Sequence, residues 1–222
     1  MITHILLLVL GFVILIIGAN WLITGGTSAA KKLHMSDLAI GLTVVAFGTS
    51  MPELVVNVIA ALQQHSDLVF GNIIGSNNFN LFLILGLAGL IMPLIVHSST
   101  VYKEIPFSLL VTIVLYLLAN ALIATQPNLS RIDGIVLLSF FGLFLWYVFQ
   151  QLSKDSTSQN IHHNERSNIT TWGLILLGLV GLIVGGRLIT IYSVQIAQQL
   201  GISQTIIGLT IVAAGTSLPE LA

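Results

Sequence analysis

The sequence predicts an all-α, polytopic membrane protein that contains two related halves. Charged residues make up 7% of the chain and hydrophobic residues 55%, whereas a typical soluble domain has about 25% charged residues. The few charges separate long apolar runs, and about 20 apolar residues are enough to cross the hydrocarbon core as a helix. One 14-residue motif also occurs twice, which indicates an internal repeat.

Six full membrane spans and the start of a seventh are expected. The first apolar run lacks a preceding Lys or Arg and a convincing cleavage site, so we interpret it as a retained helix and not as a signal peptide. The fourth and fifth runs contain no acid or base and are predicted to be packing helices. The expected spans are 3–24, 38–62, 69–95, 106–125, 134–152, 170–191 and 205 onward.

The distribution of Lys and Arg predicts the orientation, because cytoplasmic connections are enriched in these residues. We expect the amino terminus outside, the connection after the first span in the cytoplasm, and the chain in the cell (inner) membrane. The polar stretch 153–168 is expected to be a cytoplasmic linker. The residues on the cytoplasmic side are Lys31, Lys32, Lys103, Lys154 and Arg166, against Arg131 and Arg187 on the other side.

The second span contains the polar sequence Gly48-Thr-Ser-Met-Pro-Glu53 inside an apolar run. Pro52 has no N–H for the carbonyl of Gly48, so the helix is expected to bend or open there. An intramembrane carboxylate is costly and usually marks an ion or proton pathway. Thr49, Ser50 and Glu53 share one helical face because they are three or four residues apart. We therefore predict half of an oxygen-lined cation site, the alternative being a proline-kinked packing helix.

The other half is predicted from the second copy of the motif. Residues 208–221 repeat residues 41–54 at an offset of 208 − 41 = 167, with eleven of fourteen positions identical. The copies lie in the second and seventh spans, so one repeat is five spans long, and an odd repeat enters its second copy upside down. This predicts inverted-topology repeats, with the site at the midplane between two broken helices. The repeats are expected at 1–152 and from 169 to 222, joined by the linker.

The third span carries a polar stripe, because Asn72, Ser76 and Asn80 are spaced by four residues. We predict that Ser76 and Asn80 lend neutral oxygens to an ion beside Glu53. The alternative is a polar packing seam, since Asn and Ser also hold membrane helices together. Asn57, one turn after Glu53, either belongs to the site or hydrogen-bonds the third span.

Ligands of this kind, which are carboxylate, hydroxyl, amide and carbonyl oxygens, suit hard cations such as Na⁺ and Ca²⁺. Two glutamates neutralise one Ca²⁺. When Ca²⁺ leaves, two nearby carboxylates in a low dielectric require sodium ions or a proton in its place. Such mutual exclusion is itself an exchange mechanism. We expect no cofactor, and with no basic cluster there is no indication of nucleic-acid binding.

The motif at 41–53, the segment 71–80 and the second Gly-Thr-Ser-x-Pro-Glu at 215–220 resemble the α-repeats of the sodium/calcium exchanger family, in its prokaryotic antiporter branch. This resemblance implies ten helices in two inverted repeats and exchange of Ca²⁺ for Na⁺ by alternating access. The ion ligands that it implies are Thr49, Ser50, Glu53, Ser76, Asn80, Thr216, Ser217 and Glu220, with the carbonyls of Ala46 and Ala213.

Two departures from the family pattern affect the expectation. Asn78 stands where the family commonly has an aliphatic residue. The two interpretations are that Asn78 shifts the affinity for the ion or that it only faces a neighbour. The last three helices of the second repeat are absent, so a truncated fragment that does not transport unaided is one alternative. A cation/proton antiporter on the same scaffold is another. An intramembrane enzyme is disfavoured, because no Asp lies within a span and Ser50 and Ser217 have no His at the same depth.

Overall fold

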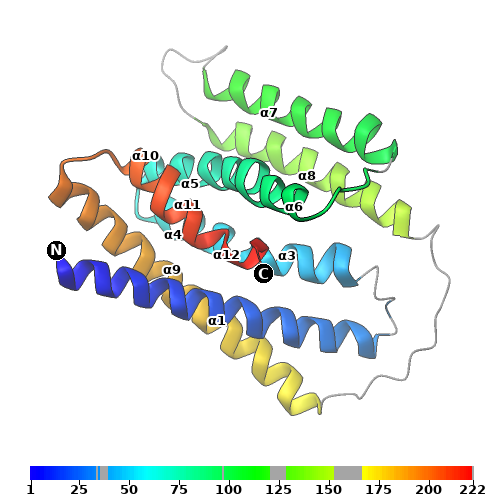
Figure 1. Cartoon of the computed structure of the whole chain (residues 1–222), viewed down its shortest axis with the longest axis horizontal. Coiled ribbons are helices and arrows are strands. Elements are labelled where there is room, and N and C mark those ends of the chain that lie inside the picture. The colour runs from blue at the N-terminus through cyan, green and yellow to red at the C-terminus, as the bar shows by residue number, and fades with distance from the viewer. Residues whose placement is uncertain (34, 36–39, 97, 121–128, 153–166, 222) are drawn as a thin grey trace. The chain divides into compact units, whose positions relative to one another are not determined.

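The computed structural model describes residues 1–33, 35, 40–96, 98–120, 129–152 and 167–221. The elements within these ranges are helices (Figure 1), and they belong to two compact units. One unit combines Met1–Met92 with Ser158–Ala222, and the other is Pro93–Thr157. Both copies of the repeated motif therefore lie in the first unit.

Two long helices, α1 (Ile2–Lys32) and α9 (Asn168–Leu200), form the most extensive contact in the first unit (Figure 1). Their crossing is made by glycines. A Cβ atom added to Gly18 would lie 2.9 Å from the carbonyl oxygen of Gly178, and one added to Gly185 would lie 2.8 Å from the carbonyl oxygen of Gly11. Backbone thus meets backbone, as small residues allow in membrane helices. The order of the two pairs shows that the helices run antiparallel.

The ends of this contact follow the same pairing. The rings of His4 and Tyr192 lie 5.8 Å apart at one end, and at the other end a Cβ atom on Gly25 would lie 3.0 Å from the carbonyl oxygen of Thr171. At the offset of 167 between the motif copies (208 − 41 = 167), His4 corresponds to Thr171 and Gly25 to Tyr192. Each of these contacts therefore has a counterpart in which the residue of α1 and the residue of α9 are replaced by their equivalents on the other helix.

The remaining helices of the first unit are shorter and connect the two motif copies to this pair. The helices of the first copy and of the third span are η1 (Gly41–Val45), α3 (Ala46–Thr49), α4 (Met51–Leu62), α5 (Ser66–Asn78), η2 (Phe79–Ile84) and α6 (Leu85–Ile91). The helices that follow α9 are α10 (Gln204–Ile207), η4 (Gly208–Val212), α11 (Ala213–Thr216) and α12 (Leu218–Leu221). The elements labelled η are short π-helical segments.

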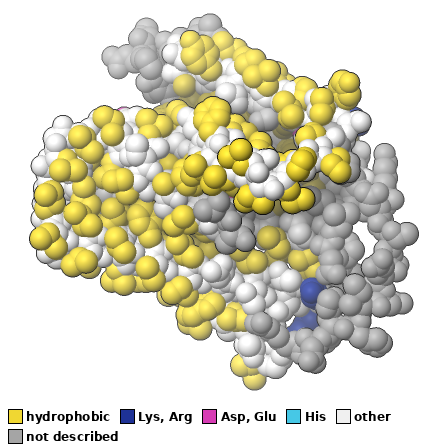
Figure 2. Space-filling model, in the orientation of Figure 1, with side chains coloured by type: hydrophobic (Ala, Val, Ile, Leu, Met, Phe, Trp, Pro, Cys, Tyr) yellow, Lys and Arg dark blue, Asp and Glu magenta, His cyan; other side chains and the backbone are white. Residues whose placement is uncertain are grey.

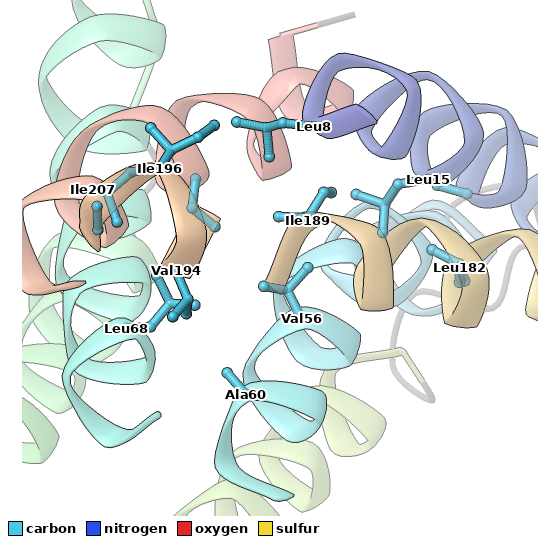
Figure 3. Close-up of a cluster of buried hydrophobic side chains, with 13 residues drawn as sticks. Leu8, Leu15, Val56, Ala60, Leu68, Leu182, Ile189, Val194, Ile196 and Ile207 are labelled. Carbon is cyan, nitrogen blue, oxygen red and sulfur yellow. The ribbon is translucent and has the colours of Figure 1, made fainter. Parts of the chain in front are cut away.

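The core of the first unit fixes the first motif copy against α9. Leu15 of α1, Leu182 and Ile189 of α9 and Val56 of α4 are buried in one cluster (Figure 3). Gly186 allows α4 to approach, because a Cβ atom there would lie 2.9 Å from the side chain of Val55. The broken second span is therefore held on the same helix that crosses α1.

The second unit contains η3 (Thr100–Glu104), α7 (Ile105–Ala119) and α8 (Arg131–Leu152). Phe107 packs against Phe140 and Phe144, with ring centroids 6.2 Å away in each case, and the Tyr147 hydroxyl donates to a Glu104 carboxylate oxygen at 3.2 Å. The helices expected for the fourth and fifth spans are confirmed in outline. Residues 121–125 of the expected fourth span lie outside the described residues, as do residues 153–166 of the expected linker.

The membrane assignment is confirmed by length and composition. Among the described residues, five helices are long and apolar enough to cross a bilayer, and the bent pair Thr43–Thr49 and Met51–Leu62 makes a sixth. Hydrophobic side chains are spread widely over the described part of the face in Figure 2. The start of the seventh span corresponds to the shorter apolar helix Gln204–Thr216.

Some predicted boundaries were wrong. The helix α1 continues past Thr24 to Lys32, because the hydroxyls of Thr24 and Ser28 donate to backbone carbonyls of the preceding turn and so do not interrupt the helix. The helix α9 continues past residue 191 and stops only where Gly201, with φ of 67°, adopts the left-handed conformation of a helix end. The third span ends before residue 95, because Met92 is extended.

Candidate cation site

The first motif copy forms a broken helix, as the sequence predicts. The segments Thr43–Thr49 and Met51–Leu62 are bent by 46° relative to each other, and Ser50 lies at the break. Pro52 lies at the beginning of α4, where a missing N–H is tolerated because the first N–H groups of a helix have no partner within it. The proline therefore starts a second helix, and Glu53 is in its first turn.

The second copy repeats this local structure element by element. A π-helical segment, η4, is followed by the short helix α11, a break at Ser217 and the helix α12 with Glu220 in its first turn. In both copies the π-helical segment immediately precedes the alanine whose carbonyl is an implied ligand, Ala46 or Ala213. Short π-helical insertions often occur at functional sites.

The two copies meet through their serines and glutamates. The Ser217 hydroxyl donates to Oε1 of Glu53 at 3.0 Å. In the reciprocal arrangement, the Ser50 side chain lies close to the carboxyl group of Glu220, and the two carboxyl groups are close enough to interact electrostatically. Each acidic group is thus next to the serine of the other copy, so the two copies of the motif lie together.

The third span faces the second copy. Ser76 is buried on α5, and its Oγ lies 3.4 Å from Oγ1 of Thr216, which is also buried. The contact depends on Gly75, because a Cβ atom there would lie 2.6 Å from the backbone oxygen of Leu209 and from the side chain of Ala213. The glycines of α5 therefore allow the polar stripe to reach the motif in η4 and α11.

Three buried side-chain oxygen atoms of the predicted ligands have no hydrogen-bond partner among the described residues. They are Oε2 of Glu53, Oε2 of Glu220 and Oδ1 of Asn80. A buried oxygen acceptor without a donor or cation costs free energy. All three are acceptors and none is a donor, so the chemistry of this set fits a cation and not an anion.

The other implied ligands differ in their surroundings. The Thr49 hydroxyl donates to the Ala46 carbonyl at 3.1 Å, while Ala46 and Ser50 themselves are exposed. The Ala213 carbonyl is buried and accepts the backbone N–H of Ser217 at 3.1 Å. Among the described residues there is no cluster of three or more His, Cys, Asp or Glu side chains. Any ion bound here must therefore take neutral oxygens in addition to carboxylates.

Asn72 was not predicted as a site residue, although it belongs to the polar stripe. It is fully buried, its Nδ2 donates to Oδ1 of Asn57 at 2.9 Å, and its Oδ1 accepts from the Thr216 hydroxyl at 3.2 Å. Asn57 therefore hydrogen-bonds the third span, one of its two predicted roles, while Asn78 is exposed. The spacing of four residues from Ser76 was the available signal for Asn72.

Two broken helices that bring acidic and neutral oxygens together in a helical membrane protein are typical of secondary cation transporters. Comparison with known proteins gives the particular family. The family model described as sodium/calcium exchanger protein matches residues 3–150 and 170–222. The chain belongs to the sodium/calcium exchanger family, whose members are transporters of cations by antiport and not enzymes.

Individual relatives agree with this assignment. The chain is 38% identical over 219 residues to the putative antiporter CaxA of Alkalimonas amylolytica, a match that covers 96% of this chain and 67% of CaxA. It is 30% identical over 257 residues to the sodium/calcium exchanger MaX1 of Methanosarcina acetivorans, covering 97% of this chain and 72% of MaX1.

Among solved structures, the chain resembles the sodium-calcium exchanger NCX_Mj of Methanococcus jannaschii. The TM-score is 0.58 at 33% identity, and the match covers 99% of this chain and 70% of NCX_Mj. The chain therefore spans about two thirds of the length of these relatives.

Proposed function

We propose that this protein exchanges Ca²⁺ for Na⁺ by alternating access at the site between the two motif copies. The observation that carries the proposal is the set of three buried, unpartnered oxygens on Glu53, Glu220 and Asn80. Around them we assign as further ligands the side chains of Thr49, Ser50, Ser76, Thr216 and Ser217 and the carbonyls of Ala46 and Ala213.

The charge of the site supports Ca²⁺ as one transported ion. Two carboxylates balance one divalent cation, and oxygen ligands on flexible, broken helices suit Ca²⁺ better than Mg²⁺, which dehydrates reluctantly. When Ca²⁺ leaves, the nearby carboxylates repel each other in a low dielectric. Sodium ions entering in its place remove that repulsion, so occupancy by one ion type excludes the other.

The packing of α1 against α9 supports the inverted repeat on which the proposed alternating access is based. Gly11 and Gly18 correspond, at the offset of 208 − 41 = 167, to Gly178 and Gly185, and the contacts of these glycines are reciprocal across the antiparallel pair. Two inverted halves can face either side of the membrane by equivalent movements, while the site stays near the midplane.

Uptake of radioactive Ca²⁺ into vesicles that contain the purified chain tests the proposed function. We expect an outward Na⁺ gradient to drive uptake and an outward proton gradient without Na⁺ to drive none. Uptake driven by the proton gradient alone would favour the cation/proton antiporter. Failure of both gradients to drive uptake would contradict antiport by this chain. Empty vesicles are the control.

We also propose that the amino terminus is outside and that the carboxyl end of α1 is cytoplasmic. The Lys32 ammonium donates to Oδ1 of Asn168 at 2.5 Å, so the end of α1 and the beginning of α9 lie on the same side. The chain has no cysteine, which allows single cysteines to report the topology. We expect Gln199→Cys, at the far end of α9, to react with a membrane-impermeant maleimide in intact cells.

The matched variant Leu33→Cys, beside Lys32, is expected to react only after permeabilisation. Both positions are exposed in the structure, so burial does not distinguish them. Labelling of Leu33→Cys but not Gln199→Cys in intact cells would reverse the proposed orientation.

A further inference from the structure

The buried amide of Asn72 connects three helical elements that carry site residues. It is 0% exposed, and a buried amide is costly unless its donor and acceptor groups are paired. Its Nδ2 donates to Asn57, one turn after Glu53 on α4, and its Oδ1 accepts from Thr216 on α11. Asn72 itself lies on α5, one turn before Ser76.

The close approach that makes these bonds depends on a glycine beside Asn72. A Cβ atom on Gly71 would lie 2.5 Å from the backbone oxygen of Thr205 and 3.1 Å from Cα of Gly208. The Gly208 end of η4 is equally close, since a Cβ atom there would lie 3.0 Å from the backbone nitrogen of Asn72. The backbones of α5 and η4 are thus in direct contact at the level of Asn72.

The Thr216 hydroxyl has a choice of acceptors. Its Oγ1 lies 3.2 Å from Oδ1 of Asn72 and 3.3 Å from the backbone oxygen of Ala213, while the Ser76 hydroxyl, 3.4 Å away, can itself donate to Thr216. A hydroxyl group has one proton and two lone pairs, so donation to one acceptor leaves the other free. In the first copy the equivalent Thr49 donates to the Ala46 carbonyl at 3.1 Å.

The acceptor that Thr216 uses decides whether the Ala213 carbonyl can bind a cation. A carbonyl oxygen has two lone pairs, and one of them already accepts the Ser217 N–H at 3.1 Å. Donation from Thr216 would occupy the second. If Thr216 donates its proton to Asn72 instead, the Ala213 carbonyl keeps one lone pair that a cation can use. The Thr216 oxygen then also has a lone pair available to the cation, because its proton points at the Asn72 amide.

We infer that Asn72 is a positioning residue that makes the Thr216 hydroxyl and the Ala213 carbonyl available as cation ligands by accepting the Thr216 proton. This inference rests on the proposed function, because it assigns a role toward the same ion. Asn72 acts through its neighbours and does not itself contact the ion. Asn57 holds the amide so that its oxygen, and not its nitrogen, faces Thr216.

A double-mutant cycle on the purified chain, with Ca²⁺ binding measured by titration, tests the inference. Asn72→Leu, which is similar in volume but has no acceptor, is expected to weaken Ca²⁺ binding about tenfold, the effect of one lost hydrogen bond. Thr216→Val also weakens binding. Adding Asn72→Leu to Thr216→Val is expected to cause little further loss, because Asn72 acts through the hydroxyl that is already gone.

The outcomes separate this inference from the proposed function. Additive losses in the double variant would show that Asn72 only stabilises the fold, and an unchanged affinity of Asn72→Leu would also overturn the inference. Absence of Ca²⁺ binding by the unsubstituted chain would overturn the proposed function as well. Asn78→Leu, on the exposed face of the same helix, is the control and should bind as the unsubstituted chain does.

If Asn72→Leu does not fold, Asn72→Ser gives the same test, since serine is polar but too short to reach Thr216. Its expected loss of Ca²⁺ affinity is also about tenfold, and it should again disappear in the Thr216→Val background. Full affinity in Asn72→Ser would contradict the inference.

Discussion

Replacement of Glu53 by Gln is expected to abolish Ca²⁺ exchange at physiological Ca²⁺ concentrations. The substitution leaves one negative charge against the two positive charges of the ion, in a region of low dielectric. The lost charge-assisted contact should weaken Ca²⁺ binding by several kcal/mol, roughly thousands-fold. The shape of the side chain and the acceptor for the Ser217 hydroxyl are preserved, so the effect reports charge and not packing.

Glu220→Gln is expected to cause comparable damage, because the serine–glutamate contacts of the two copies are reciprocal. The measurement is Na⁺-driven uptake of radioactive Ca²⁺ at matched protein content. Asp67→Asn, an exposed acid at the start of α5, is the control and should transport normally, because exposed charges contribute little. Normal uptake by Glu53→Gln would rule out the two-carboxylate site and favour a proline-kinked packing helix.

A single methyl group at the crossing of α1 and α9 is expected to destabilise the fold. In Gly185→Ala the new Cβ atom would lie 2.7 Å from the backbone nitrogen of Leu15 and 2.9 Å from its Cα. Backbone atoms cannot rotate away, so the two helices must separate. Overpacking of this kind costs about 1–3 kcal/mol, and we expect the midpoint of thermal unfolding in detergent to fall by several degrees.

Gly173→Ala is the matched control on the same helix, because a Cβ atom there meets nothing within 4 Å. Alanine is favoured over glycine in a helix interior by up to about 1 kcal/mol, so this variant should unfold at the same or a higher temperature. Gly18→Ala, at the position equivalent to Gly185, should behave as Gly185→Ala does. Equal midpoints for Gly185→Ala and Gly173→Ala would show that the crossing is not closely packed.

The parts of this protein that were predictable from sequence are those where a local chemical rule has few solutions. Pro52 cannot continue the hydrogen bonding of a helix, so a break near it was expected and is confirmed at Ser50. Glu53 within an apolar run, repeated as Glu220, predicts an ion pathway, and this role stays a prediction. The fixed spacing of the repeat made the two copies visible without any tertiary information.

The parts that were not predictable depend on how distant segments approach each other. The role of Asn72 required knowing that Thr216 lies beside it, and a stripe of polar residues alone does not specify which neighbour it meets. The π-helical segments have no clear sequence signal, because an inserted residue changes the helix without changing its composition. The helices α1 and α9 extend beyond the apolar runs from which their spans are predicted, because polar residues near the end of a run do not stop a helix.

The lengths of α1 and α9 imply that exchange should depend on the thickness of the lipid bilayer. Their 31 and 33 residues correspond to about 46 and 50 Å of helix, whereas the hydrocarbon core is about 30 Å thick. Such helices tilt or extend into the headgroup layer, and thinner membranes increase the tilt. Because the glycine crossing fixes one helix against the other, the pair must tilt together. Short-chain lipids would then reorient a packed two-helix unit as a whole, together with the core that holds the first broken helix on α9.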